Sequence, residues 1–304
     1  MSITRSGFEL LTLLERRGSG KYTQKYLSEE LSLSVGIVNK LMREYEENQY
    51  IECEAGSIRV TEAGLEALEP YRVKHAVILA AGFSERLAPV TLQIPKPLVT
   101  VHGTRIVDTL IDALLDAGIT DITMVIGYKK EQFTQLKEKY PCLNLVENPA
   151  FNESGNITTL YTALDKLDST YICDADLYIH NPEVIRKYEY KSCFFGTPLH
   201  GTDDWCFTLS GKKIKSFRMG GEKCCQAIMM AYLNPEDSEL MKNDLEKIIH
   251  SRGGKQMWWF DALFNRNISE YEIEAKICNP DDVSEVDTIN DLIKLDKCYL
   301  GIQL

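Results

Sequence analysis

The chain has no run of about twenty apolar residues, the length that a membrane-spanning helix needs. Its first residues contain no long apolar core followed by a small-residue cleavage site. The nine cysteines are odd in number, and no two of them form a Cys-x-x-Cys pair that would seed a zinc site. We therefore expect no membrane partner, and a cytoplasmic protein with reduced thiols.

Basic residues are in the minority. Lys and Arg number 34 against 45 Asp and Glu, a net charge of −11, which excludes a general affinity for nucleic acids or anionic membranes. The five histidines are scattered, and none is paired with a Cys or Ser in a nucleophilic pattern. The chain also lacks a Walker A loop and a Gly-x-Gly-x-x-Gly fingerprint. A phosphate site must therefore be of another kind.

Such a site is indicated between Val77 and Gly103. A hydrophobic run ends in an Ala-Ala-Gly turn, and the run predicts a buried parallel strand. Gly82 can release the backbone so that its amides turn toward an anion. Arg86 and Lys96 follow at spacings that suit one polyphosphate and supply fixed positive charge. An ordinary turn is the alternative, but the coincidence of these features favours a nucleoside triphosphate site.

The same segment carries a resemblance. Leu-Ala-Ala-Gly-x-x-x-Arg-Leu followed by Pro-Lys-Pro-Leu is similar to the signature of sugar-phosphate and alcohol-phosphate nucleotidyltransferases, and in particular of phosphocholine cytidylyltransferases of the bacterial LicC type. Segments 127–133, 136–140, 171–176 and 285–288 extend the resemblance over about residues 75–300. It implies CTP and Mg²⁺, with Lys96 and Arg86 as catalytic residues. The residues it implies in nucleotide binding are Leu79, Ala80, Ala81, Gly82, Asn156 and Asp174.

Two acidic pairs are candidate metal ligands. Asp174 and Asp176 directly follow a predicted strand, and alternation sends both side chains to the same side, where hard oxygen ligands suit Mg²⁺. The resemblance makes Asp176 the ligand. It also implies that Asp287 completes the site, with Glu285 as a further candidate. From the residues alone, acidic groups ahead of a helix serve equally well as caps.

The acceptor pocket is expected around the three tryptophans, Trp205, Trp258 and Trp259. Indole faces attract a quaternary ammonium, and Asp204 or Asp261 could add a countercharge. The alternative, that these rings belong to the core, stays open. We expect phosphocholine as the acceptor. A primary amine such as 2-aminoethylphosphonate would favour the carboxylates instead, and a sugar 1-phosphate comes third.

Asn156 ends a polar loop ahead of a predicted helix. In the enzymes that the chain resembles, the equivalent loop helps to read the nucleotide base, which makes Asn156 a candidate base or ribose contact. A helix cap is the equal alternative.

Residues 1–72 form a separate domain, whose pattern of apolar residues differs from that of the rest of the chain. Apolar spacing predicts helices at 8–15, 22–31 and 35–49, a hairpin of 50–53 with 57–60, and a helix at 61–68 capped by Thr61. This order resembles a MarR-like winged helix. Nine basic against twelve acidic residues give the domain a net charge of −3, which argues against DNA binding. We favour dimerisation or packing on the catalytic domain, and a homodimer stays open. A metabolite-sensing transcription regulator is the hypothesis from another class.

Residues 73–304 form the second domain, in which strands and helices alternate. This pattern predicts a Rossmann-like α/β nucleotidyltransferase fold with a mostly parallel sheet, which binds ligands at the carboxyl ends of its strands. The predicted strands are 75–80, 122–127, 143–147, 170–175, 192–197 and 226–232. The predicted helices are 105–117, 129–140, 154–166 and 235–250.

The resemblance generates a first prediction. Asp176→Asn and Lys96→Ala should each abolish nucleotidyl transfer, because one removes a metal ligand and the other the charge that holds the triphosphate. Pyrophosphate release measures the transfer, and circular dichroism checks that the fold is intact. Retained activity in either variant would contradict the assignment.

Overall fold

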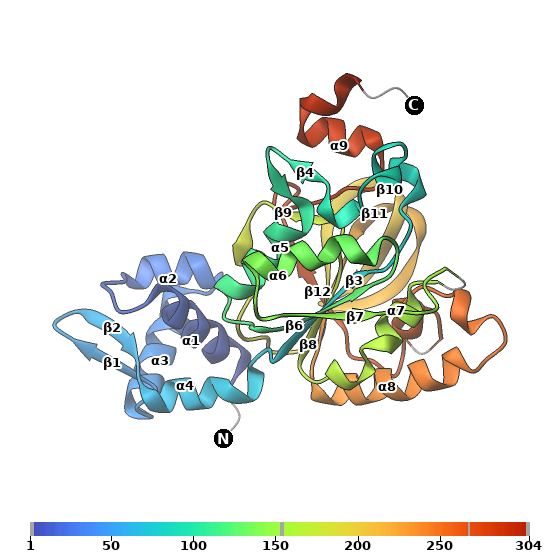
Figure 1. The fold of residues 1–304 in the computed structure, drawn as a ribbon. Coiled ribbons are helices and arrows are strands. Elements are labelled where there is room, and N and C mark those ends of the chain that lie inside the picture. Colours follow the sequence, from blue (N-terminus) through green and yellow to red (C-terminus); the bar gives the residue numbers. More distant parts are fainter. Residues whose placement is uncertain (1–2, 153–154, 267, 302–304) are drawn as a thin grey trace. The chain divides into compact units, whose positions relative to one another are not determined.

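The computed structural model describes residues 3–152, 155–266 and 268–301 of the chain (Figure 1). These residues divide into two compact units. The first is Met1–Arg72 with Tyr188–Tyr190, and the second is Val73–Lys187 with Lys191–Leu304. None of the helices in the described part of the chain combines the length and the hydropathy needed to cross a bilayer.

The first unit follows the predicted order of elements, and each of its four α-helices begins behind a hydroxyl cap. Thr4, Thr23, Ser34 and Thr61 accept a backbone N–H three residues on, which confirms Thr61 as a cap. Phe8, with the leucines of the first helix, lies in the core of this unit. The elements are α1 (Arg5–Arg17), α2 (Gln24–Leu31), α3 (Val35–Glu47), β1 (Ile51–Glu54), β2 (Ser57–Val60) and α4 (Glu62–Leu68).

The second unit is built on a seven-stranded sheet, counted over the described residues, with strand order β10-β12-β11-β8-β3-β6-β7. β8, β3, β6 and β7 run parallel to one another, and β11 joins β8 antiparallel. The mostly parallel α/β sheet is therefore confirmed. The strands are β3 (His75–Ala80), β6 (Asp121–Ile126), β7 (Leu143–Glu147), β8 (Thr170–Asp174), β10 (Cys193–Ser210), β11 (Lys213–Leu233) and β12 (Glu274–Ile277).

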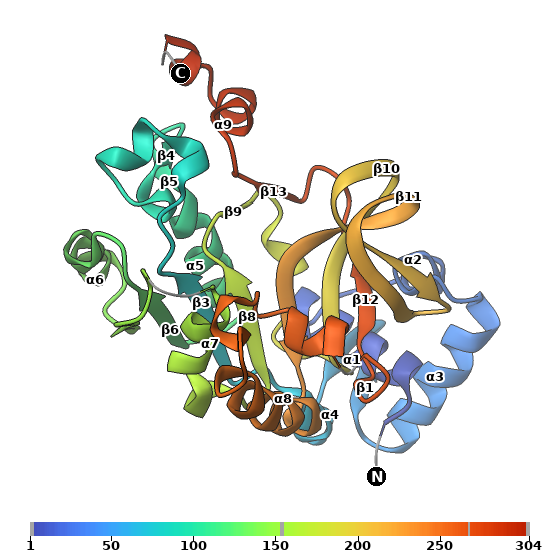
Figure 2. The same cartoon turned by 90° about the vertical axis from the view of Figure 1, so that its right-hand side faces the viewer.

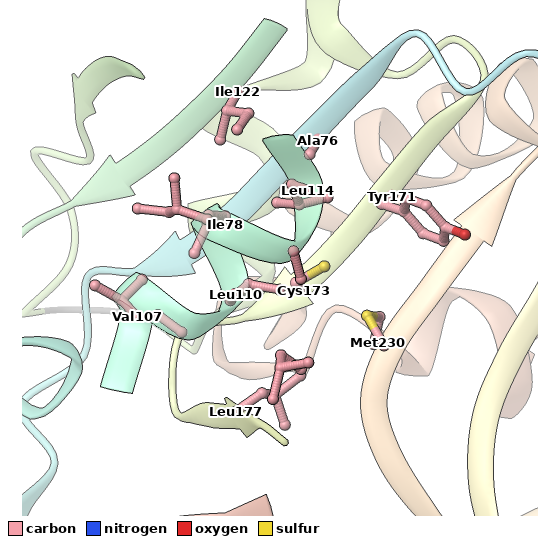
Figure 3. Packing of buried hydrophobic residues seen from close by; sticks show 14 of the residues in the cluster. Ala76, Ile78, Val107, Leu110, Leu114, Ile122, Tyr171, Cys173, Leu177 and Met230 are labelled. Atoms are coloured by element: carbon pink, nitrogen blue, oxygen red, sulfur yellow. The ribbon is translucent and has the colours of Figure 1, made fainter. Parts of the chain in front are cut away.

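Helices cover both faces of this sheet, so its central strands are apolar at most positions, and β3 is apolar throughout 76–80. Ala76 and Ile78 of β3 pack with α5 (Ile106–Asp116) on one face, where Figure 3 shows the cluster around Leu110. Val77 and Leu79 point to the other face, toward α7 (Ile157–Thr162) and α8 (Pro235–Ile249). This double burial holds the carboxyl end of β3 in place, from which the Ala-Ala-Gly loop departs.

The predicted strands at 192–197 and 226–232 are only parts of longer ones. β10 and β11 form an antiparallel hairpin with several register shifts, which curls as Figure 2 shows. The short sheets β4 (Thr100–Val101) with β5 (Thr104–Arg105) and β9 (Leu177–Ile179) with β13 (Val283–Glu285) were not predicted, because two- or three-residue strands carry no readable alternation. The last α-helix of the described residues is α9 (Ile289–Leu295), and a 3-10 helix, Lys297–Gly301, follows it.

Two predicted helices are mostly not α-helical. Residues 129–140 form a 3-10 helix, Lys130–Gln135, before the single turn α6 (Leu136–Lys139). Of the helix predicted at 154–166, residue 154 lies outside the described residues, α7 spans six residues, and a 3-10 turn follows. β-Branched Ile157, Thr158 and Thr159 at the start of α7 have low helix propensity, which explains the short helix.

Gly82 in the Ala-Ala-Gly loop and Gly127 close to it differ in the space that the fold leaves for a Cβ atom. A Cβ added at Gly127 would lie 2.6 Å from the Phe151 side chain and 2.9 Å from the Ala81 carbonyl oxygen. A Cβ added at Gly82 would meet no atom within 4 Å. The close approach requires glycine at 127, whereas at 82 the fold leaves open space.

Gly127→Ala should therefore lower the free energy of unfolding by about 1–3 kcal/mol, because Phe151 and the backbone must shift. Gly82→Ala, the matched control, should stay within about 0.5 kcal/mol of the wild type. Urea unfolding of both variants measures the difference. Equal stability of the two would contradict this account of Gly127.

Candidate active site

The loop that leaves β3 lines a cavity of about 410 Å³. The cavity lies where β3 and β8 end, and because these neighbouring strands are parallel, their carboxyl ends share one edge of the sheet. All six predicted nucleotide-binding residues line it. The lining residues are Leu79, Ala80, Ala81, Gly82, Phe83, Ser84, Glu85, Arg86, Lys96, Pro97, Phe151, Gly155, Asn156, Thr159, Asp174, Ala175, Asp176, Trp258 and Asp287.

Lys96 is the buried cation of this cavity. Its side chain is 7% exposed, and its Nζ lies 2.7 Å from both Asp176 Oδ2 and Asp287 Oδ1. Burial alone would lower the pKa of Lys96, but the charges and hydrogen bonds of the two aspartates outweigh it and raise the pKa. The ammonium is therefore charged at every physiological pH. Arg86 lies 3.0 Å from Asp287, with its own side chain 70% exposed and able to turn to a ligand.

A short β-ladder brings Asp287 to Asp176. β13 pairs antiparallel with β9 so that Glu285 lies opposite Leu177, and the Val286 N–H donates to the Asp176 carbonyl. Thr288 caps α9, with Asp291 completing the capping box. The capping alternative for Asp287 is therefore wrong, since another residue caps the helix.

Three carboxylates gather at this point: ligand oxygens of Asp176, Glu285 and Asp287 lie within 4.8 Å of one another. Asp176 Oδ1 is buried and has no hydrogen-bond partner among the residues that the structure describes. Burial, and then the charges of Asp176 and Asp287, raise the pKa of Glu285 well above its ordinary value. An unpartnered buried oxygen within a cluster of oxygen donors fits a hard divalent cation, which would offset the repulsion among the carboxylates.

Asn156 lines the cavity but does not cap α7 through its side chain. Its Oδ1 instead accepts the backbone N–H of Trp259 at 2.9 Å. Asp174 Oδ1 accepts the indole N–H of the same Trp259 at 3.0 Å. Burial, and then the charge of Asp176, raise the pKa of Asp174. Asn156 therefore occupies the N-cap position of α7, as the alternative predicted, but its side chain makes no capping hydrogen bond and is tied to a distant loop.

Of the three tryptophans, Trp258 alone is among the described residues that line the cavity, and it is 49% exposed. Trp259 is fully buried. Trp205 packs against Phe217 and Phe260, with ring centroids 5.6 and 5.0 Å away. The structure therefore does not bring the three indoles together around one cavity.

The two candidate countercharges both bond to neighbouring backbone. Asp261 accepts the Trp258 N–H at 2.8 Å, and Asp204 accepts the Trp205 N–H at 2.7 Å. Neither residue lines the cavity.

Sequence reasoning missed an aromatic group at the cavity. Phe83 and Phe151 line it, with ring centroids 5.4 Å apart, and Tyr128 lies 5.2 Å from Phe83. Phe83 occupies a variable position of the Ala-Ala-Gly motif, and Tyr128 belongs to the Gly-Tyr-Lys-Lys segment. The aromatic residues at these positions were the only signal in the sequence. They indicate a shared group only when the structure shows that the segments carrying Phe83, Tyr128 and Phe151 lie together.

A model of the nucleotidyl transferase family matches residues 75–192. The 2-aminoethylphosphonate cytidylyltransferase of Lancefieldella rimae is 35% identical over 230 residues, which cover 74% of this chain and 93% of that protein. The chain belongs to the nucleotidyltransferase family and is a cytidylyltransferase. The choline-phosphate cytidylyltransferase of Streptococcus pneumoniae is 29% identical over 225 residues, covering 73% of this chain and 96% of that protein.

Solved structures agree with the nucleotidyltransferase fold. The CTP:phosphocholine cytidylyltransferase from Streptococcus pneumoniae superposes with a TM-score of 0.68 at 28% identity, covering 75% of this chain and 99% of that one. The inositol-1-phosphate CTP transferase from T. maritima has a TM-score of 0.60 at 15% identity, with coverages of 77% and 99%, a likeness of fold alone.

The charge of the carboxylate cluster can be tested through stability. Glu285→Gln removes one negative charge from a group whose ionisation is opposed by burial and two aspartates. Without metal at pH 7, the variant should be more stable than the wild type, because the neutral amide avoids the burial and repulsion that oppose the charge of Glu285. Added Mg²⁺ should stabilise the wild type more than the variant, because one ligand is missing.

Thermal unfolding with and without Mg²⁺ measures both effects. Lys74→Gln is a control for the loss of one charge outside the carboxylate cluster. It removes an exposed ammonium that pairs with Asp168. Equal responses of wild type and Glu285→Gln to Mg²⁺ would contradict a ligand role for Glu285.

Proposed function

We propose that this cytidylyltransferase transfers CMP from CTP to a small phosphonate or phosphate that carries an amine, and releases pyrophosphate. The observation that carries the proposal is the buried ammonium of Lys96, held between Asp176 and Asp287 at the cavity that the Ala-Ala-Gly loop lines. We further propose that Mg²⁺ is the metal, with Asp176 and Asp287 as ligands and Glu285 as the third candidate.

In the proposed reaction, an oxygen of the acceptor forms a bond to the α-phosphorus of CTP as the bond to the pyrophosphate oxygen breaks. That acceptor oxygen is already ionised near neutral pH, so the protein needs no strong base. Lys96 and Arg86 bind the negative charge of the triphosphate, and the loop 79–82 positions it. Mg²⁺, when bound, would supply Lewis-acid polarisation of the α-phosphate.

For the acceptor we propose 2-aminoethylphosphonate first and phosphocholine second. The Lancefieldella rimae relative that bears the first name is more similar over a comparable length than the relative that bears the second. Of the three tryptophans expected to form a cage for a quaternary ammonium, only Trp258 lines the cavity in the described residues, together with Phe83 and Phe151. That exposed indole is also the observation that keeps phosphocholine as the second candidate.

For residues 1–72 we propose a winged-helix domain that does not serve general DNA binding. The order of three helices, a hairpin and a closing helix supports the fold. The third helix exposes Lys40 and Arg43, but also Glu44, Glu46 and Glu47, whose charges would repel phosphate. Self-association is the role we favour for this domain.

The reaction is tested by pyrophosphate release from CTP, UTP, ATP or GTP in the presence of Mg²⁺, each with 2-aminoethylphosphonate, phosphocholine or glucose 1-phosphate. We expect release with CTP and 2-aminoethylphosphonate alone, because the relative named for that acceptor is more similar to this chain than the relative named for phosphocholine. Release with phosphocholine instead would keep the transfer and overturn the acceptor. The absence of release with every pair would contradict the proposed function.

A further inference from the structure

The buried Trp259 contacts two side chains of the cavity without lining the cavity itself. Its backbone N–H donates to Asn156 Oδ1 at 2.9 Å, and its indole N–H donates to Asp174 Oδ1 at 3.0 Å. Phe194 stacks on the ring at a centroid distance of 5.6 Å, and Phe260 meets it edge-on at 6.0 Å. A ring packed in this way cannot reach a ligand, but it can hold the two residues to which it donates.

Asp174 is the first of these residues. It ends β8 two positions before Asp176, whose carboxylate already binds Lys96. A further carboxylate there without a partner of its own could compete for the ammonium or for a cation. The indole N–H bonds to Asp174 Oδ1 and so favours one orientation of this side chain, in which it stays with Trp259.

Asn156 is the second. A backbone N–H can only donate, so the atom of the Asn156 amide that faces Trp259 must be the oxygen. The NH₂ of this side chain is then the group left for the cavity, which Asn156 lines. It offers donors alone, which suit the acceptor atoms of a nucleotide: base carbonyl and ring-nitrogen lone pairs, or ribose oxygens.

We propose that Trp259 is a positioning residue for nucleotidyl transfer, which orients Asp174 and Asn156 from beneath rather than forming a wall of the acceptor pocket. The inference rests on the proposed function, since it assigns Trp259 to the nucleotide side of the same cavity. It also replaces the expectation that Trp259 contacts the amine of the acceptor.

The test is Trp259→Phe, which keeps a buried aromatic ring but removes the indole N–H together with one ring of the indole. Asp174 then loses its donor, and kcat/KM for CTP should fall about tenfold or more, while KM for the acceptor changes less than about twofold. The affinity for CTP, measured by calorimetry without acceptor, should fall in parallel.

Tyr271→Phe is the matched control. Tyr271 is 1% exposed, lies outside the cavity lining, and donates its hydroxyl to the Asp244 carboxylate at 2.9 Å. This variant also deletes one aromatic donor to a buried carboxylate, so it should lose stability and keep its kcat/KM for CTP.

Two outcomes would overturn the inference. A rise in acceptor KM with kcat/KM for CTP unchanged would make Trp259 a wall of the acceptor pocket. Equal kinetics in Trp259→Phe and Tyr271→Phe would leave it a purely structural residue. If the wild type turns over no acceptor but only Trp259→Phe loses affinity for CTP, the proposed function fails while the positioning role is supported.

Discussion

The ion pairs of Lys96 with Asp176 and Asp287 are the interaction on which the site depends. They join three segments far apart in the sequence: the Pro-Lys-Pro turn, the residues that follow β8 and the residues that follow β13. A buried ammonium is costly unless it is paired, and gathered carboxylates are costly unless a cation lies among them. The ammonium and the carboxylates therefore offset the cost of burying one another. Together they place charged groups beside the cavity that the Ala-Ala-Gly loop lines.

The sheet makes this arrangement possible. Strands β3 and β8 are parallel neighbours, buried on both faces by helices, so their carboxyl ends are rigid and lie side by side. The Ala-Ala-Gly loop follows the end of β3, and Asp174 and Asp176 lie at and just after the end of β8. The β9–β13 ladder then adds a second constraint, because its antiparallel register carries Asp287 back to Asp176. Cytidylyl transfer relies on positioned charge, and a rigid edge of this kind supplies it.

The tryptophans show how one residue type can take three different places. Trp258 lies open on the cavity, Trp205 packs among phenylalanines, and Trp259 is buried with both N–H groups engaged. Indole chemistry alone predicts a cage for all three equally. Burial and hydrogen bonding differ among the three tryptophans. They make Trp259 a residue that positions Asp174 and Asn156 instead of one that contacts the acceptor.

What the sequence by itself determined is local. Apolar periodicity predicts the buried β3 and the helices of the first unit, and cap residues and glycine predict where helices begin and where the Ala-Ala-Gly turn lies. These signals act over a few neighbouring residues. The tertiary structure alone decided the contact of Asp287 with Lys96, the partner of Asn156 and the aromatic group of Phe83 and Phe151. Each of these depends on a contact between segments distant in sequence, and no local pattern encodes the strand register or the packing that makes such a contact.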